Sequence, residues 1–244
     1  GEVTPCSDDL NRACTNIASL RGDAVSMLAM IADNGIFFET KKDFADCIVT
    51  GFMKLNGQTV GAVANSGKVD TICAKGADKA ADFIKFCDAF NIPVLTLANV
   101  KGFSRNECQE KRLPKAAAKL ATAYAQATVP KVTVVTGTAY GSCYVLMGSK
   151  AIGADFVYAW PDSEIGMMDA KQAARILTDS DDAAEIRKTA AEYSDLQQNV
   201  KSAAMRGYVD TIIEDADTRK YVIGAFEMLY TKRENRPSKK HGTI

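Results

Sequence analysis

The segment Ala139-Tyr140-Gly141-Ser142-Cys143-Tyr144 holds the residues of this sequence that are best suited to chemistry. It follows the apolar run 131–137, which predicts a buried strand, and the small residues at 141–143 indicate the start of a helix. The first backbone N–H groups of a helix have no partner within it, so two of them could bind an oxyanion. Small residues also suit close packing of a helix on a sheet, and the spacing leaves both interpretations open.

Four side chains near this segment allow further chemistry. Cys143 is of the nucleophile type, but a Cys-His pair is not expected, because the single histidine, His241, lies near the end of the chain. Glu164 could act as a general acid or base, although a structural or capping carboxylate is the preferred alternative. Tyr140 and Tyr144 are expected to pack with their hydroxyls bonded to backbone, or to line a ligand slot.

Histidine and cysteine usage limits the chemistry further. One histidine leaves little room for a Ser-His-Asp triad, a His-rich metal site or a histidine proton shuttle. The cysteine count is odd and no two cysteines have C-x-x-C spacing, so we expect no metal site and no disulfide framework. The seven cysteines are Cys6, Cys14, Cys47, Cys73, Cys87, Cys108 and Cys143.

The charge balance argues against some partners. Thirty Lys and Arg residues match thirty Asp and Glu residues, so neither nucleic acid nor an anionic membrane is an expected partner. The sequence shows no basic segment followed by an apolar one at its start, and no apolar run approaches the roughly 18 residues of a spanning helix. Together with the unpaired cysteines, these features predict a reducing, cytoplasmic location.

Strands and helices alternate up to about residue 160, which predicts an α/β architecture with a mostly helical final third. The clearest element is a hairpin over 47–65, because Asn56-Gly57 suits a type I′ turn. Gly35 is expected to end a helix over 21–35 in a left-handed cap. Further helices are expected over 77–90, 113–128, 181–199 and 215–234, a turn into a helix over 139–150, and strands over 36–40, 92–100, 131–137 and 155–160.

Three predicted strand ends, 64–67, 98–103 and 136–143, mark the expected ligand-binding edge, because ligands of open α/β sheets bind beyond the carboxyl ends of strands. No low-complexity linker divides the chain, so a single domain over 1–244 is expected. Its first dozen residues, 1–12, are expected to be a flexible lead-in. Residues 233–244 form a basic tail, either a solvated end or a contact to phosphate or coenzyme A.

Several long blocks resemble one family. AYAQATVPKVTVVTGTAYGSCYVLM and GADFVYAWPDSEIGMM are similar to the C-terminal half of the biotin-dependent acyl-CoA carboxyltransferases, which include the β subunits of propionyl- and acetyl-CoA carboxylases and the large subunit of methylmalonyl-CoA transcarboxylase. The likeness extends to FMKLNGQTVGAVAN, DKAADFIKFCDAFNIPVLTL, AAMRGYVDTIIEDADTRKYVIGAFEMLYTKR and RPSKKHG. The resemblance implies a crotonase-like (ClpP-type) β-β-α superhelix, in agreement with the predicted elements.

The family's reaction needs no histidine. It moves a carboxyl group between carboxybiotin and the α-carbon of an acyl-CoA, and two oxyanion holes supply most of the catalysis. The resemblance implies that the C-terminal half provides the biotin-side hole from an AYGG(A/S)Y motif, here Ala139–Tyr144, with the amides of Ser142 and Cys143 as donors. The position of Val145 influences acyl-chain choice in relatives. The resemblance thus implies catalytic roles for Gly141, Ser142 and Cys143, and cofactor binding by Tyr140, Tyr144, Val145, Gly102 and Phe103.

Departures from the family pattern gather at the ligand loops. The family's DVPGF-x-PG loop reads NVKGFSRNE, which keeps Gly102 and Phe103 but loses the aspartate, the proline and the later glycine. Ser142 replaces the second glycine of the motif, the loop after Asn65 is shorter, and QQNVK replaces a proline–aromatic element. Relaxed selection on catalysis, or a changed partner, would produce this distribution.

The N-terminal half of typical family members, which binds acyl-CoA and forms the enolate-side hole, has no counterpart in this sequence. The resemblance therefore implies a carboxyltransferase subunit or domain that needs such a half, a biotin carboxyl carrier protein and a homo-oligomer, either a dimer or a ring of dimers. We expect no turnover by the chain alone, on acetyl- or propionyl-CoA or their carboxylated forms. Two alternatives stay open: a non-catalytic scaffold or assembly subunit, and a stand-alone crotonase-type hydratase or isomerase.

Overall fold

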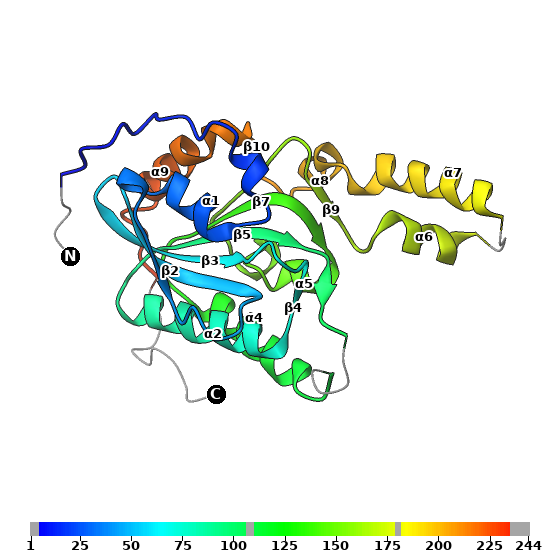
Figure 1. Cartoon of the computed structure of the whole chain (residues 1–244), viewed down its shortest axis with the longest axis horizontal. Coiled ribbons are helices and arrows are strands. Elements are labelled where there is room, and N and C mark those ends of the chain that lie inside the picture. Colours follow the sequence, from blue (N-terminus) through cyan, green and yellow to red (C-terminus); the bar gives the residue numbers. More distant parts are fainter. Residues whose placement is uncertain (1–4, 106–109, 179–181, 235–244) are drawn as a thin grey trace.

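A mixed β-sheet forms the centre of the computed structural model, which describes residues 5–105, 110–178 and 182–234. The strands follow the order β1-β2-β3-β5-β7-β8-β10, and β9 pairs with the end of β7 (Figure 1). The first three strands are antiparallel, and every pairing from β3 onward is parallel. The strands are Phe37–Thr40 (β1), Ile48–Leu55 (β2), Gln58–Asn65 (β3), Val94–Val100 (β5), Lys131–Tyr140 (β7), Phe156–Ala159 (β8), Glu164–Gly166 (β9) and Thr211–Ile212 (β10).

The hairpin β2–β3 confirms the clearest sequence prediction. Asn56 and Gly57 have φ angles of 49° and 73°, and a type I′ turn requires positive φ at both of these positions. Leu55 and Gln58 pair directly across the turn, so the turn sets the register of both strands.

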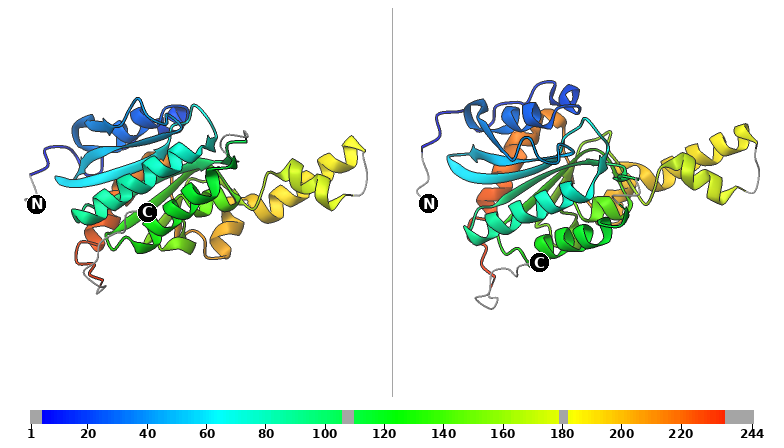
Figure 2. Two further views of the ribbon diagram at one scale, coloured as in Figure 1. Left: turned by 90° about the horizontal axis from the view of Figure 1, so that it is seen from below. Right: turned by 60° about the horizontal axis from the view of Figure 1, so that its bottom comes forward.

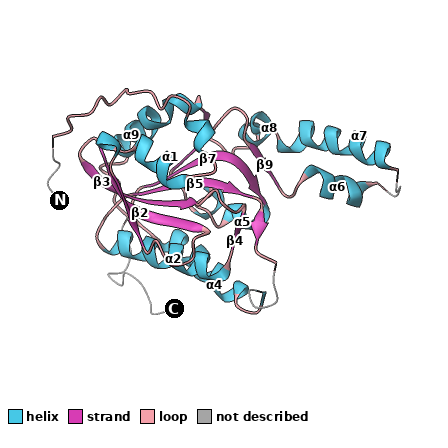
Figure 3. Cartoon of the chain, in the orientation of Figure 1, coloured by secondary structure: helices cyan, strands magenta, loops and turns pink. Residues whose placement is uncertain are grey.

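Helices cover both faces of the sheet (Figures 2 and 3). On one face α2 and α4 pack side by side over an apolar cluster that includes Ile84 and Leu120. On the other face α1 and α9 cover a second cluster, which includes Leu28 and Phe226. The helices are Ala24–Ile31 (α1), Ala74–Ala89 (α2), Leu113–Gln126 (α4), Gly141–Val145 (α5), Ala170–Leu177 (α6), Ala183–Tyr193 (α7), Val200–Met205 (α8) and Thr218–Met228 (α9).

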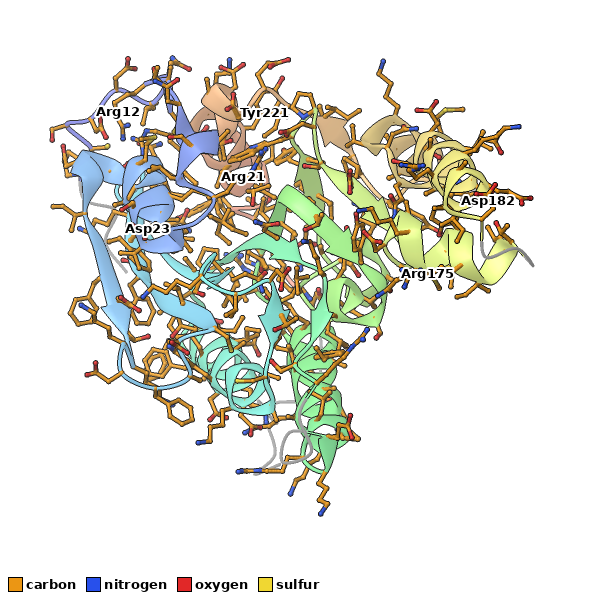
Figure 4. The ribbon with its side chains drawn as sticks, turned by 45° about the vertical axis from the view of Figure 1, so that its right-hand side comes forward. Arg12, Arg21, Asp23, Arg175, Asp182 and Tyr221 are labelled. Carbon is orange, nitrogen blue, oxygen red and sulfur yellow. The ribbon has the colours of Figure 1, made fainter. Side chains whose placement is uncertain are left out.

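Two elements of the final third leave the body of the molecule. Helices α6 and α7 lie side by side and extend outward as a helical arm (Figure 1). Arg175 and Asp182 lie on this arm, one on α6 and one at the start of α7 (Figure 4). A π-helical turn, Ser194–Gln198, returns the chain to the body, where α8 follows.

A second, two-stranded sheet lies beside the carboxyl ends of the central strands. Strand Thr71–Ile72 (β4) pairs in parallel with Gly102–Phe103 (β6). The Lys101 N–H donates to Asp70 O at 2.7 Å, and the Ser104 N–H donates to Ile72 O at 2.9 Å. The loops after β3 and β5 are therefore fastened to each other.

The first predicted helix is shorter than expected. Helix α1 ends at Ile31, Ala32 is extended, and Asp33–Gly35 form a separate 3₁₀ turn. The Asp33 carboxylate turns inward and accepts hydrogen bonds from the backbone of the β2–β3 turn, which a continuous helix would not allow. Gly35 has a φ of 71°, so its expected left-handed conformation is confirmed, but it closes the 3₁₀ turn.

The strand before the candidate site is longer than predicted, and the helix after it is shorter. Strand β7 continues through Thr138, Ala139 and Tyr140, because these residues pair with β9. Helix α5 has only five residues, whereas the sequence predicted a turn into a helix over 139–150. This correction places Tyr140 at the end of a strand and Gly141 at the turn.

The expected flexible lead-in is fastened to the body within its described part. Arg12 donates to Met30 O and Ala32 O, both at 3.0 Å, and pairs with Asp8 at 3.0 Å. The prediction for the basic tail falls mostly on residues 235–244, outside the described residues, as do His241 and Cys108. Within the described ranges, every helix is too short or too polar to cross a lipid bilayer.

Candidate functional site

The turn from β7 into α5 depends on a glycine. Gly141 has a φ of 60°, in the left-handed region that residues with a side chain rarely adopt. A Cβ atom at this position would lie 2.9 Å from Met167 O, so a larger residue would also collide with backbone. The glycine lets the chain change direction at once after Tyr140 and brings the next amides to the surface.

Ser142 and Cys143 lie in the first turn of α5, and both residues line the groove described below. Within the described parts of the chain, no acceptor outside α5 receives a hydrogen bond from either amide. The dipole of a five-residue helix is small, so any anion held here depends on the two N–H groups themselves. Two adjacent unpaired donors are the arrangement that an oxyanion hole requires.

A groove of about 790 Å³ lies in front of these amides. It is formed where β6, the end of β7 and the segment after β9 meet. Gly102 and Phe103 line one side and Tyr140 lies at the base of the turn, so three predicted cofactor-binding residues border the space. The full lining consists of 70–71, 101–105, 140–143, 167–169 and Gln172.

Tyr140 and Glu164 form a hydrogen-bonded pair at the groove. The Tyr140 hydroxyl donates to Glu164 Oε2, across the pairing of β7 with β9. Burial and this carboxylate raise the pKa of Tyr140, so the phenol stays neutral at physiological pH. Because its carboxylate is engaged in holding the Tyr140 ring, Glu164 matches the structural role rather than that of a free acid or base.

Cys143 is unsuited to nucleophilic attack. Its side chain is buried, and its Sγ donates to Gly102 O at 3.2 Å. Burial raises the pKa of the thiol to about 12, so the sulfur is protonated at physiological pH. The side chain therefore joins α5 to β6, and the residue also forms part of the groove lining.

Two predicted cofactor-binding residues lie apart from this groove. Tyr144 is buried in the apolar cluster beneath α2 and α4, and its hydroxyl has no partner among the described residues. Burial raises the pKa of this hydroxyl as well. Val145 is half-buried at the end of α5 and, like Tyr144, is not part of the groove lining.

Asparagine side chains organise the strand ends, and the sequence analysis did not single them out. Asn99 Oδ1 accepts from the Thr138 N–H at 3.0 Å, and the Asn99 N–H donates to Asn65 Oδ1 at 3.2 Å. Gly137 leaves the space for this network, since a Cβ there would lie 2.5 Å from Asn99 Oδ1. Both asparagines lie in predicted strand ends, but the bulge at Asn99 that aligns them has no sequence signal.

Arg21 provides a further link that the sequence did not reveal. Its Nε donates to Thr136 O and its guanidinium pairs with Asp162, both at 2.5 Å, while Cζ lies 5.0 Å from the centre of the Trp160 ring (Figure 4). The residue thereby ties the loop before α1 to the carboxyl end of β7.

Among residues 5–105, 110–178 and 182–234, no three His, Cys, Asp or Glu side chains gather in a way that could hold a metal ion.

The hairpin, the parallel strands and a strand-to-helix turn that offers amides to a groove define a crotonase-like α/β protein, as predicted. A solved structure of transcarboxylase 12S, described as a hexamer with hydrolysed methylmalonyl-coenzyme A bound, matches the whole chain with a TM-score of 0.93 and 39% identity, over 50% of its own length. The β subunit of P. aeruginosa geranyl-CoA carboxylase matches 90% of the chain with a TM-score of 0.78 and 28% identity, over 43% of its own length.

The sequence comparisons agree with this class. The protein-family model described as the carboxyl transferase domain matches residues 5–244, so the chain belongs to this family. It is 44% identical to the propionyl-CoA carboxylase beta chain of Cereibacter sphaeroides over all of this chain and 49% of the relative. It is 41% identical to the methylmalonyl-CoA decarboxylase subunit alpha of Veillonella parvula, over 97% of this chain and 47% of the relative. The chain spans about half the length of these relatives.

Proposed function

We propose that this chain supplies the biotin-side oxyanion hole of an acyl-CoA carboxyltransferase. The amides of Ser142 and Cys143 would donate to the ureido oxygen of biotin in the groove beside them. The observation that carries this proposal is the combination of two adjacent amides, without a described acceptor outside α5, and a groove of about 790 Å³ in front of them. A ureido oxygen is an acceptor, so the donor set fits this group.

When bound, carboxybiotin supplies the carboxyl group that is transferred. The chain's own residues stabilise negative charge and position the ring: two amides donate hydrogen bonds, while Gly102, Phe103 and Tyr140 border the space. In acyl transfer, loss of one such donor costs about 10²–10³-fold in rate. Tyr144 and Val145 lie apart from the groove, so a role of Val145 in acyl-chain choice would act through the packing of α5.

The proposed complex contains other chains. An N-terminal-type half, on a separate chain or on the same polypeptide, would supply the acyl-CoA site and the enolate-side hole, since the chain spans about half of its relatives. A carrier protein would bring biotin, and copies of the chain would assemble into a dimer or a ring of dimers in the cytoplasm. The substrates would be acetyl- or propionyl-CoA and their carboxylated forms, and one domain would extend over residues 1–244.

The experiment replaces one amide. Ser142→Pro removes the N–H, and proline is tolerated in the first turn of a helix because those N–H groups have no partner within it. Ser142→Ala keeps the N–H and removes only the hydroxyl. In a complex with a chain that supplies the missing half, we expect Ser142→Pro to lower methylmalonyl-CoA-dependent carboxylation of free biotin by about 10²-fold or more, and Ser142→Ala to retain it.

Three outcomes would contradict this proposal. A folded, complete complex that transfers no carboxyl group would support the scaffold role. Equal activity of Ser142→Pro and Ser142→Ala would show that the amide is not used. Hydration or isomerisation of an enoyl-CoA by the chain alone would support a stand-alone crotonase-type enzyme, although Glu164 is already engaged with Tyr140.

A further inference from the structure

Two cysteines from distant elements meet beside the candidate site. Cys47, just before β2, and Cys73, just before α2, place their sulfur atoms 3.2 Å apart. A disulfide bond is about 2.05 Å long, so the two sulfurs need to approach by only about 1.2 Å. Both cysteines are free thiols.

A buried lysine holds the two cysteines together. Lys79 on α2 is almost fully buried, and its Nζ donates to Phe44 O and Ile48 O, both at 2.8 Å. These two carbonyls flank Cys47 in the sequence, so the ammonium group fastens the loop that carries Cys47 to α2, whose N-cap residue is Cys73. Two hydrogen bonds that involve neither thiol thus help to hold the two cysteines in place, beside the bond between the thiols themselves.

A glycine makes room for one sulfur. A Cβ at Gly76, in the first turn of α2, would lie 2.4 Å from Cys47 Sγ. The absence of a side chain at this position is what allows the Cys47 sulfur to lie against the start of the helix, next to Cys73.

The two thiols differ in accessibility. Cys47 is 5% exposed, and burial raises its pKa to about 12. Cys73 is half-buried, and its sulfur accepts a hydrogen bond from the Gly76 N–H at 3.3 Å. An oxidant from solution therefore meets Cys73 first, and Cys47 is placed to react with the product.

We propose that Cys47 and Cys73 form a redox-active pair that a small peroxide converts into an intramolecular disulfide. The Cys73 sulfur attacks one peroxide oxygen, the O–O bond breaks, and a sulfenic acid and one molecule of water form. As the Cys47 sulfur attacks the Cys73 sulfur 3.2 Å away, the Cys47 proton passes to the departing sulfenic oxygen, so the S–O bond breaks, a second water forms and no free Cys47 thiolate is required. Two thiols and one hydrogen peroxide thus give one disulfide and two waters, and a dithiol reductant reverses the change.

The position of the pair links it to the groove. Cys73 directly follows β4, whose partner β6 contributes Gly102 and Phe103 to the groove lining. A disulfide would tether the end of β4 to the start of β2 and so restrict the strand pair that borders the candidate site. The Ser104 N–H donates to Ile72 O, so the rate of hydrogen exchange at the Ser104 amide measures this restriction.

The test uses the full chain and hydrogen peroxide, and it requires no enzymatic activity. After oxidation and blocking of free thiols, peptide mapping is expected to find one cross-linked peptide joining Cys47 to Cys73, lighter by two hydrogen atoms and cleaved by dithiothreitol. Hydrogen exchange at the amide of Ser104 is expected to slow several-fold on oxidation. An absent cross-link, a link to Cys143 in its place, or unchanged exchange at Ser104 would overturn the proposal.

Matched variants complete the test. Cys73→Ser is expected to abolish the cross-linked peptide, and Cys6→Ser is expected to retain it, because Cys6 is also half-buried but has no sulfur neighbour among the described residues. If a variant fails to fold, the peptide map of the oxidised wild-type chain decides by itself whether Cys47 and Cys73 form a disulfide. Persistence of the cross-linked mass in Cys73→Ser would contradict the assignment.

Discussion

The Arg219 guanidinium is fully buried and donates to Asp33 Oδ1 and Ile31 O, both at 2.7 Å. Ser142 and Cys143, by contrast, line a groove, and their amides have no described acceptor outside α5. Asp33 in turn accepts from the Asn56 and Gly57 amides at 3.1 and 2.8 Å. Although burial opposes it, these bonds and Arg219 lower the pKa of Asp33.

The difference separates groups that stabilise the fold from groups that are available to a ligand. Buried polar groups in native proteins are almost always hydrogen-bonded, and Arg219 follows this rule with four partners from two parts of the chain, residues 8–9 and 31–33. Donors left without a partner beside a groove gain hydrogen bonds only when something binds. The following variants are expected to affect one region and spare the other.

The largest expected effect comes from Arg219→Met, which leaves the Asp33 carboxylate buried without its counter-ion. Removal of one partner of a buried pair costs about 3–5 kcal/mol, which we expect to appear in the free energy of unfolding in urea. Lys220→Met is the control, since its pair with Asp217 is exposed and is worth about 1 kcal/mol or less. Similar losses in the two variants would contradict the distinction.

Gly141→Ala is expected to disturb the groove more than the fold. The left-handed conformation costs a non-glycine residue about 1–2 kcal/mol, and the new Cβ also meets Met167 O. Gly207→Ala is the matched control, because Gly207 has a φ of 80° but nothing within 4 Å of a Cβ. Both variants should lose stability in urea denaturation, but only Gly141→Ala should lose biotin carboxylation in the complete complex. Loss of activity in both would show a general effect of destabilisation.

Acid is expected to weaken the Arg219 region before it affects the groove. The hydrogen bond from Arg12 holds the pKa of Asp8 at about 2, below its usual 3.8. A lowered pKa in the folded state gives stability that is present above pH 3.8 and is lost as the pH falls toward 2. Urea midpoints measured between these pH values should fall for the wild-type chain and fall less for Asp8→Asn. If the urea midpoints of the wild-type chain and of Asp8→Asn fall equally with pH, Asp8 is not the cause of the loss of stability in acid.

The smallest expected effect is that of Cys143→Ala. The change removes a weak hydrogen bond to Gly102 O and keeps the amide, so we expect a loss of about 1 kcal/mol in stability and an activity within a few-fold of wild type. Complete loss of activity in a folded complex would instead indicate a role for the thiol.

Local signals in the sequence were enough for the hairpin and for the buried strands. Asn56-Gly57 specifies its turn through φ alone, and apolar runs such as 131–137 have few alternatives to a buried strand. The extension of β7 to Tyr140 depends on pairing with Glu164–Gly166, which lie more than twenty residues further along, so it had no local signal. The position of Gly141 at the turn was predictable because only glycine suits it.

The groove was only half predictable for the same reason. Gly102, Phe103 and the 140–143 turn follow strands, and a parallel sheet brings such ends together. The opposite side, 167–169 and Gln172, is brought into place by β9 and by the start of α6, whose packing no local pattern reveals. Tyr144 was placed in the site by its neighbours in the motif, but a helical turn directs it into the core.

The Asp33 contacts have a consequence for the order of folding. The Asp33 carboxylate accepts from the Gly57 N–H in the β2–β3 turn and from Arg219 on α9. The β2–β3 hairpin is therefore linked to a residue that is synthesised more than 150 residues later. Contacts of such long sequence separation slow folding and make it cooperative. Truncation before α9 should therefore destabilise the N-terminal hairpin as well as the deleted residues, and during synthesis Asp33 should gain its bond to Arg219 only once α9 has left the ribosome.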